Sequence, residues 1–166
     1  MPVVVGVDRP VLEQSVQKLR GSFDVILIDG AAKLQDMSIS AIKAADLVLI
    51  PVQPSVLDIW AAGDLVELIK ARQSVTEGRP RALFLVSRQI GGTRLAQDAN
   101  AALAALGLPV LAGRTTQRVL YAECISTGST VLDLEPNGAA ASEITAILAE
   151  IQGLTTAATL GHPDHG

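Results

Sequence analysis

The feature that most constrains this chain is the alternation of short apolar runs with longer segments of helical periodicity. Continuous apolar runs occur at residues 25–28, 47–50 and 83–86, as in strands that are buried on both faces. Segments with apolar residues at helical spacing lie between and after them, as over 55–69 and 93–106. This alternation is typical of parallel strands joined by crossover helices. The sequence therefore predicts an α/β fold of three layers, with a mostly parallel sheet flanked by helices.

Shorter patterns complete the expected order of elements. Further strands are expected at 3–7 and 109–112, and further helices at 11–19, 38–45, 117–126 and 138–152. Asp8, Thr93 and the pair Ser55 and Asp58 are the expected helix caps. We expect one domain over residues 1–152, followed by a small, polar and disordered tail over 153–166.

Composition excludes several classes of protein. Hydrophobic residues make up 49% of the chain and charged residues 18%, which favours a packed core over disorder. The net charge of −4 argues against a generic polyanion binder, although a local basic face stays possible. Cys124 has no second cysteine to pair with, as expected in a reducing cytoplasm. No signal-peptide pattern and no run long enough to span a membrane is present in the sequence.

Small, polar or charged residues follow the predicted strands directly. They occupy residues 29–30, 51–54, 87–88 and 113–116. Because parallel sheets bind ligands beyond the carboxyl ends of their strands, we expect these segments to share one edge of the sheet. Asp29 is the most specific of them, since four apolar residues followed by Asp form a Walker B pattern that suits Mg²⁺ coordination or orientation of a water. Alternatively, Asp29 caps the turn that follows it.

The order and spacing of several segments resemble the ParA/MinD family, especially the small plasmid-partition ParA proteins. The resemblance covers roughly residues 1–152 and rests on FDVILIDGA at 23–31, ADLVLIPVQPS at 45–55, and residues 57–58, 61–63, 87–88, 114–121 and 128–131. It implies a P-loop NTPase-like fold and a dimerising ATPase that uses ATP or ADP with Mg²⁺, binds nonspecific DNA and responds to a ParB-like centromere-binding partner. It also implies plasmid or chromosome partitioning in the cytoplasm, on the nucleoid.

The resemblance also assigns roles to single residues. Asp29 corresponds to the Walker B aspartate, as catalytic and metal-binding residue. The residues expected near the nucleotide or the dimer interface are Gly30, Pro54, Arg88 and Arg114.

One part of the family pattern has no counterpart in these 166 residues. A P-loop needs a Gly-Lys-Ser/Thr, and the four lysines, Lys18, Lys33, Lys43 and Lys70, all follow residues other than glycine. The fold is therefore expected to be N-terminally truncated relative to the family, and this chain alone is expected not to hydrolyse ATP. The alternative is a non-catalytic ParA-like module that dimerises or pairs with a partition protein. A response-regulator-like enzyme is disfavoured, because only Asp29 fits the acidic cluster that such a fold requires.

Residues 70–94 are locally basic in an acidic protein. This segment carries several cations against a single acid, Glu77. A surface of this kind can contact DNA phosphates without sequence preference, or it can be ordinary solvated charge. With a second patch near the last strand, the predicted DNA-binding residues are Lys70, Arg72, Arg79, Arg81 and Arg118.

Overall fold

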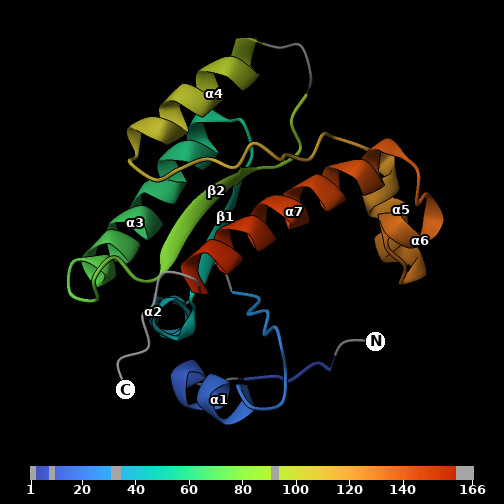
Figure 1. Cartoon of the computed structure of the whole chain (residues 1–166). Coiled ribbons are helices and arrows are strands. Elements are labelled where there is room, and N and C mark those ends of the chain that lie inside the picture. The colour runs from blue at the N-terminus through green and yellow to red at the C-terminus, as the bar shows by residue number, and fades with distance from the viewer. Residues whose placement is uncertain (1–2, 8–9, 31–34, 91–93, 160–166) are drawn as a thin grey trace. The chain divides into compact units, whose positions relative to one another are not determined.

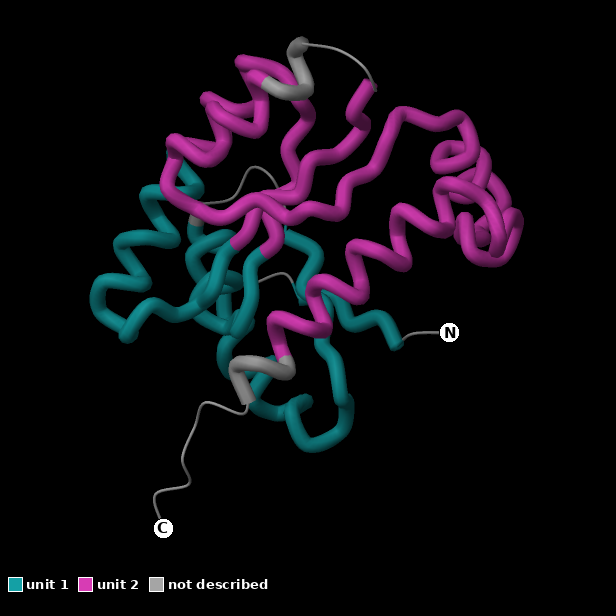
Figure 2. The backbone as a smooth tube through the Cα atoms, turned by 45° about the horizontal axis from the view of Figure 1, so that its top comes forward, with its two compact units in different colours: residues 1–48, 64–82 teal, residues 49–63, 83–166 magenta. Residues whose placement is uncertain are grey.

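The computed structural model describes residues 3–7, 10–30, 35–90 and 94–159. These residues form two compact units, shown in Figure 2. Unit 1 contains residues 1–48 and 64–82, and unit 2 contains residues 49–63 and 83–166. Each unit is described by itself below.

Helices and strands alternate over residues 35–105, and the elements named after residue 105 are helices (Figure 1). The elements are α1 (Leu12–Leu19), α2 (Gln35–Ala44), β1 (Leu47–Val52), α3 (Val56–Gln73), β2 (Arg81–Val86), α4 (Arg94–Ala105), α5 (Val119–Thr127), α6 (Val131–Leu134) and α7 (Ala139–Thr159). Within the described residues, no helix combines the length and apolar character that a membrane span requires.

The sheet is parallel. Strands β1 and β2 are neighbours, and α3 forms the crossover between them. In unit 2, Phe84 of β2 also forms a parallel bridge with Val110, since its N–H donates to Pro109 and its carbonyl accepts from Leu111, both at 2.9 Å. The predicted strand at 109–112 is thus present as a short third partner of the sheet. The predicted class, an α/β fold with a parallel sheet flanked by helices, is confirmed.

The core of unit 2 lies around the second half of β2. Phe84 is fully buried, and so is Leu103 of α4, while Val86 and Leu111 are almost completely buried. Phe84 and Leu103 are among the largest fully buried side chains in the described chain. A continuous apolar strand can bury both faces only between two layers, which is why this run became the centre of the unit.

Two predicted strands do not form. Residues 3–7 and 25–28 have no strand assignment, and Val25 and Leu27 are 82% and 89% exposed. An apolar run becomes a buried strand only where neighbouring strands supply hydrogen-bond partners and a second layer covers its side chains. Neither condition is met for 25–28 among the described residues, so its prediction as a buried central strand was wrong.

Several boundaries differ from the expected ones. Pro51 lies inside β1 instead of ending it, which a strand with one unpaired edge tolerates because proline lacks only the N–H donor. Helix α7 continues to Thr159, through the start of the expected tail, and residues 160–166 lie outside the described part. Trp60 of α3 is 72% exposed. The predicted caps Asp8 and Thr93 also lie outside the described residues.

Sequence reasoning missed the short helix α6. Its N-cap is Thr130, whose hydroxyl accepts from the N–H of Asp133 at 3.3 Å, while the Asp133 carboxylate accepts from the N–H of Thr130 at 2.9 Å. These two bonds form a capping box. The hydrogen bonds to Thr130 also lower the pKa of Asp133. The signal was present in the sequence as Thr-x-x-Asp, with the apolar pair Val131 and Leu132 between Thr130 and Asp133.

Candidate ligand-binding rim

Three of the predicted loop segments lie together in unit 2. The N–H of Ser87 donates to the carbonyl of Val52 at 2.9 Å, and the N–H of Thr115 donates to the carbonyl of Val86 at 3.1 Å. The pairing continues past β2, because Gln89 and Thr116 form a second parallel bridge. We call residues 51–54, 87–89 and 113–116 the rim. The prediction that these segments share one edge of the sheet is met within unit 2.

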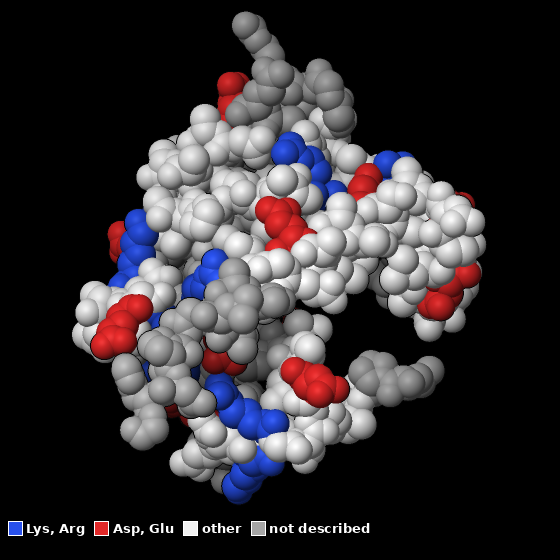
Figure 3. Space-filling view, in the orientation of Figure 1, with Lys and Arg blue, Asp and Glu red and all other residues white. Residues whose placement is uncertain are grey.

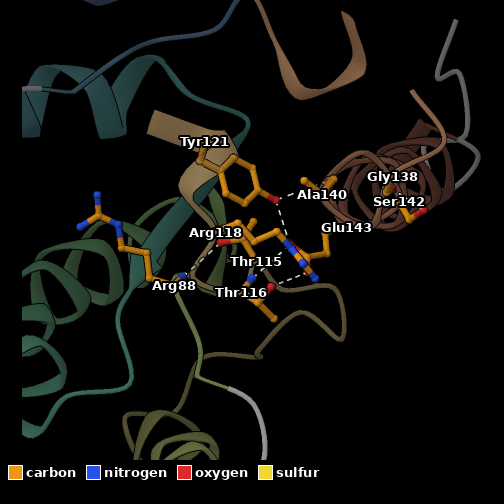
Figure 4. A network of polar contacts seen from close by, with 9 residues as sticks. All are labelled: Arg88, Thr115, Thr116, Arg118, Tyr121, Gly138, Ala140, Ser142 and Glu143. Atoms are coloured by element: carbon orange, nitrogen blue, oxygen red, sulfur yellow. Dashed lines mark hydrogen bonds and ion pairs between the residues drawn. The ribbon is translucent and has the colours of Figure 1, made fainter. Parts of the chain in front are cut away.

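Arg88 occupies an unusual position on the rim. Its φ of 53° lies in the left-handed region, which costs a residue with a side chain about 1–2 kcal/mol. Its N–H donates to the Thr115 hydroxyl at 3.2 Å, and this bond helps to hold the turn. In Figure 4 the exposed guanidinium points away from the neighbouring polar network. Strained backbone is concentrated at functional sites, which makes Arg88 a candidate for ligand contact.

Arg114 is held in place more firmly than Arg88. One guanidinium nitrogen donates to the Gln89 side-chain oxygen at 3.1 Å, and Nε donates to the carbonyl of Ala112 at 3.3 Å. These two bonds hold the side chain across the rim. A guanidinium has five N–H donors, so others remain for a ligand. Pro54, the other predicted contact residue here, is half-buried just before α3.

Glu143 of α7 is the centre of the polar network behind the rim (Figure 4). Its carboxylate accepts from the N–H and the hydroxyl of Thr116 at 3.1 and 2.7 Å. It also accepts from Nη2 of Arg118 at 2.8 Å and from the hydroxyl of Tyr121 at 2.9 Å. The Glu143 side chain is only 15% exposed. One carboxylate therefore joins the rim, the start of α5 and the first turns of α7.

The network shifts the pKa of three of its members, and the hydrogen bond to Glu143 raises the pKa of Arg118. Burial acts to raise the pKa of Glu143, but the hydrogen bonds from Arg118, Thr116 and Tyr121 outweigh it and lower that pKa to about 2. Burial and the hydrogen bond to Glu143 raise the pKa of Tyr121 to about 12. The shifts of Glu143 and Tyr121 favour the observed charge states, an ionised carboxylate and a neutral phenol.

A second glutamate of α7 supports the other end of the same loop. The Glu150 carboxylate accepts from the N–H groups of Ala112 and Gly113 at 3.0 and 2.9 Å. Glu143 and Glu150 are about two helical turns apart and so lie on one face of α7. The sequence analysis did not single out either glutamate, although two acids seven residues apart on a helix after a Thr-Thr loop were a readable signal.

Asp29 and Gly30 belong to unit 1. Both are exposed and follow the extended segment 25–28, and residues 31–34 lie outside the described part. Their assignment as metal and nucleotide ligands stays a prediction. No group of three or more His, Cys, Asp or Glu side chains that could hold a metal occurs among the described residues. Asp29 therefore offers one carboxylate, and a magnesium ion there would need oxygens from the nucleotide and water.

The predicted DNA-binding residues do not form one set. Arg118 lies in unit 2 and its guanidinium pairs with Glu143, whereas Lys70, Arg72, Arg79 and Arg81 lie in unit 1. On the face shown in Figure 3, Lys and Arg atoms form several separate groups with acidic atoms between them. The pairing gives Arg118 a structural role, because its charge neutralises Glu143.

The chain is similar in sequence to a family model and to a characterised protein. A family model described as an AAA domain matches residues 4–79. The maintenance of carboxysome distribution protein A of Halothiobacillus neapolitanus is 28% identical over 141 residues, which are 83% of this chain and 64% of that protein. The resemblance to the ParA/MinD family is confirmed. This chain thus spans less than two-thirds of the length of that relative.

A solved structure supports the fold that the ParA/MinD resemblance implies. The cell division ATPase MinD of Pyrococcus furiosus superposes with a TM-score of 0.71 at 22% sequence identity. The match covers 88% of this chain and 59% of the MinD chain. The chain therefore has a fold like that of the MinD structure.

Proposed function

We propose that this chain is the nucleotide-responsive part of a ParA/MinD-type positioning protein that partitions plasmid or chromosomal DNA. The rim of unit 2 carries the proposal. Hydrogen bonds join its three loop segments, and they follow strands at the carboxyl end of a parallel sheet, where α/β folds bind their ligands. The relatives named for carboxysome distribution and cell division are consistent with a positioning role.

The proposed ligand is ATP or ADP with Mg²⁺. Arg88 supplies an exposed guanidinium on a strained turn, and Arg114 supplies a second one that is oriented by Gln89. Guanidinium groups bind phosphate oxygens through paired, charge-assisted hydrogen bonds. Within unit 2, Pro54 would line the nucleotide. The roles proposed for Asp29 as a magnesium ligand and for Gly30 as a nucleotide contact rest on the sequence pattern of unit 1. The ion, when bound, would neutralise phosphate charge.

The sequence does not contain the group that would cradle the β- and γ-phosphates. No lysine in the 166 residues follows a glycine, so the Gly-Lys-Ser/Thr of a P-loop is absent from them. Without that lysine the developing charge of phosphoryl transfer is not offset. The proposed activity of this chain alone is therefore nucleotide binding without hydrolysis.

Calorimetric titration with ATP and Mg²⁺ tests this proposal. We expect micromolar binding by the unmodified chain, and binding weakened about tenfold in Arg88→Ala, which corresponds to the loss of a charge-assisted phosphate contact of about 1.4 kcal/mol. Asp29→Ala should weaken binding only when Mg²⁺ is present. Lys18→Ala, on the exposed side of α1, removes a cation elsewhere and should bind as the unmodified chain does.

The absence of heat in the unmodified chain would contradict nucleotide binding and favour a second candidate function. That candidate is a non-catalytic module that dimerises or pairs with a ParB-like partition protein. The observation that favours it is the exposure of apolar side chains in unit 1, which is strongest at Leu27 and Val4. Apolar surface of this kind is stabilised when a protein partner covers it. Light scattering of the chain with and without Mg²⁺ and ATP would distinguish a constitutive dimer from a nucleotide-dependent one.

Nonspecific DNA is a further proposed binding partner. Binding to it would place the protein on the nucleoid. Lys70 and Arg72 in the last turn of α3, and Arg79 and Arg81 at the approach to β2, support this proposal. In a gel shift with short duplex DNA, Arg79→Glu with Arg81→Glu should weaken binding and lower the slope of log K against log salt by about 1 for each lost phosphate contact. Lys18→Glu is the control for a single charge reversal elsewhere in unit 1. An unchanged shift in the double variant would remove this surface from the DNA interface.

A further inference from the structure

Unit 1 contains a hollow whose charged lining residues are all basic. The hollow is open to solvent, has a volume of about 190 Å³ and is lined by Lys43, Arg72, Thr76, Arg79 and Pro80. This volume is several times the roughly 30 Å³ that one water occupies in the liquid, so a hydrated oxyanion fits. We call this feature the basic hollow. Lys43 was not among the predicted DNA-binding residues.

The three cations come from separate parts of unit 1. Lys43 lies in the last turn of α2, Arg72 in the last turn of α3, and Arg79 in the loop before β2. Cations at a helix C-terminus can be explained by the helix dipole alone, which places about half a negative charge there. Two helix ends contribute about one negative charge together, against three full positive charges. The dipoles therefore leave an excess of positive charge that an anion would neutralise.

Within the described residues, no ion pair neutralises this excess, because none involves Lys43, Arg72 or Arg79. The ion pairs of Arg20 with Asp46 and of Arg118 with Glu143 lie elsewhere. Glu13 and Asp36 line an adjoining hollow that shares Lys43. Glu77 lies in the loop between Thr76 and Arg79 but does not line the basic hollow.

The loop that forms one wall is well ordered by hydrogen bonds. The Thr76 hydroxyl donates to the carbonyl of Arg72 at 2.6 Å and also contacts the carbonyl of Arg79. The N–H of Gly78 donates to the carbonyl of Gln73 at 3.0 Å, and the Gln73 side chain donates to the carbonyl of Pro80 at 2.7 Å. Because the wall is tied to α3, ligand binding would order only the ends of the three long side chains.

We infer that the basic hollow is a binding site for a phosphate group, held by Lys43, Arg72 and Arg79. This goes beyond the proposed contact with DNA, because the site needs no polynucleotide and includes a residue of α2. The shared chemistry is a phosphate oxyanion, which either a small phosphate compound or the backbone of DNA could supply.

Titration of the full chain with inorganic phosphate, at constant ionic strength set with chloride, tests the inference. In ¹⁵N–¹H spectra we expect saturable shifts of the Thr76, Gly78 and Arg79 amides. Lys43→Gln and Arg79→Gln should each raise the dissociation constant about fivefold or more, as expected for the loss of one charge-assisted contact. Lys43→Arg should retain binding, and Lys18→Gln on α1 should leave it unchanged. The absence of saturable shifts, or equal affinity in Lys43→Gln, would overturn the inference.

A second titration with short duplex DNA identifies the source of the phosphate. If DNA shifts the same amides and Lys43→Gln weakens both ligands, the source is the DNA backbone. If phosphate binds while DNA leaves these amides unmoved, the ligand is a small phosphate compound, and only the proposed DNA contact of this surface fails. Both results support the basic hollow as a phosphate site, and circular dichroism of the variants verifies that α2 and α3 are intact.

Discussion

Replacing Glu143 with alanine is expected to destabilise the chain by about 2–3 kcal/mol, because several donors lose their acceptor at once. The N–H and hydroxyl of Thr116, the guanidinium of Arg118 and the hydroxyl of Tyr121 all donate to this carboxylate. Since Glu143 is only 15% exposed, water replaces these bonds poorly. Urea-induced unfolding followed by circular dichroism measures the loss.

The pH dependence of stability provides an independent measure of the same carboxylate. The pKa of Glu143 is about 2 in the folded chain, against an ordinary value of 4.5. A lowered folded pKa stabilises the folded state fully above about pH 4.5, and this contribution is lost as the pH falls towards 2. The difference in stability between the unmodified chain and Glu143→Ala should therefore shrink over that interval.

Two variants control the Glu143 experiment. Glu123→Ala removes an exposed carboxylate of α5 in the same unit and should change stability by less than about 0.5 kcal/mol. Glu143→Gln keeps the shape but not the charge, and should fall between alanine and the unmodified chain. If Glu143→Ala were as mild as Glu123→Ala at neutral pH, the network would not hold the rim to α7.

Replacing Gly113 with alanine should cost about 1–3 kcal/mol by overpacking the rim against α7. An added Cβ would lie 2.8 Å from Cγ1 of Ile147, and 3.1 and 3.2 Å from its Cα and backbone N. The side-chain atom could move, but the backbone atoms belong to a helix and yield little. The substitution should also lengthen the bond from the Gly113 N–H to Glu150, which is 2.9 Å in the structure. Thermal unfolding and amide exchange at residues 112–116 measure the two effects.

Gly63→Ala is the matched control for Gly113→Ala. Gly63 lies inside α3, where an added Cβ meets no atom within 4 Å, so alanine should stabilise by up to about 1 kcal/mol through helix propensity. The two substitutions are chemically identical and are expected to have opposite signs. A stabilising Gly113→Ala would show that the rim and α7 do not pack as closely as the distances indicate.

The Glu143→Ala and Gly113→Ala predictions both concern the residues that hold the proposed nucleotide contacts in place. Arg88 is bonded to Thr115, and the loop that contains Thr115 is held to α7 at both ends by Glu143 and Glu150. Both variants should therefore weaken nucleotide binding by displacing the rim, without removing any group proposed to touch the nucleotide.

The sequence alone determined the class of fold and the segments that form the rim. A buried strand such as 83–86 can be recognised in the sequence because both of its faces must be apolar. Polar residues directly after such strands indicate the ligand-binding edge of the sheet. Helix periodicity likewise predicted α1 to α5 to within a few residues, and the start but not the end of α7. Both signals are local, since each depends only on residues that are near one another in the chain.

Tertiary structure alone decided which apolar runs became strands and which charges were available to a ligand. Residues 25–28 are as apolar as 83–86, but only the second run has a strand beside it and a layer above it. Arg118 and Arg88 look alike in sequence, yet Arg118 pairs with Glu143 and Arg88 faces solvent. The physical reason is that hydrogen-bond partners and ion pairs come from residues distant in the chain, so their energies depend on the packing that brings those residues together.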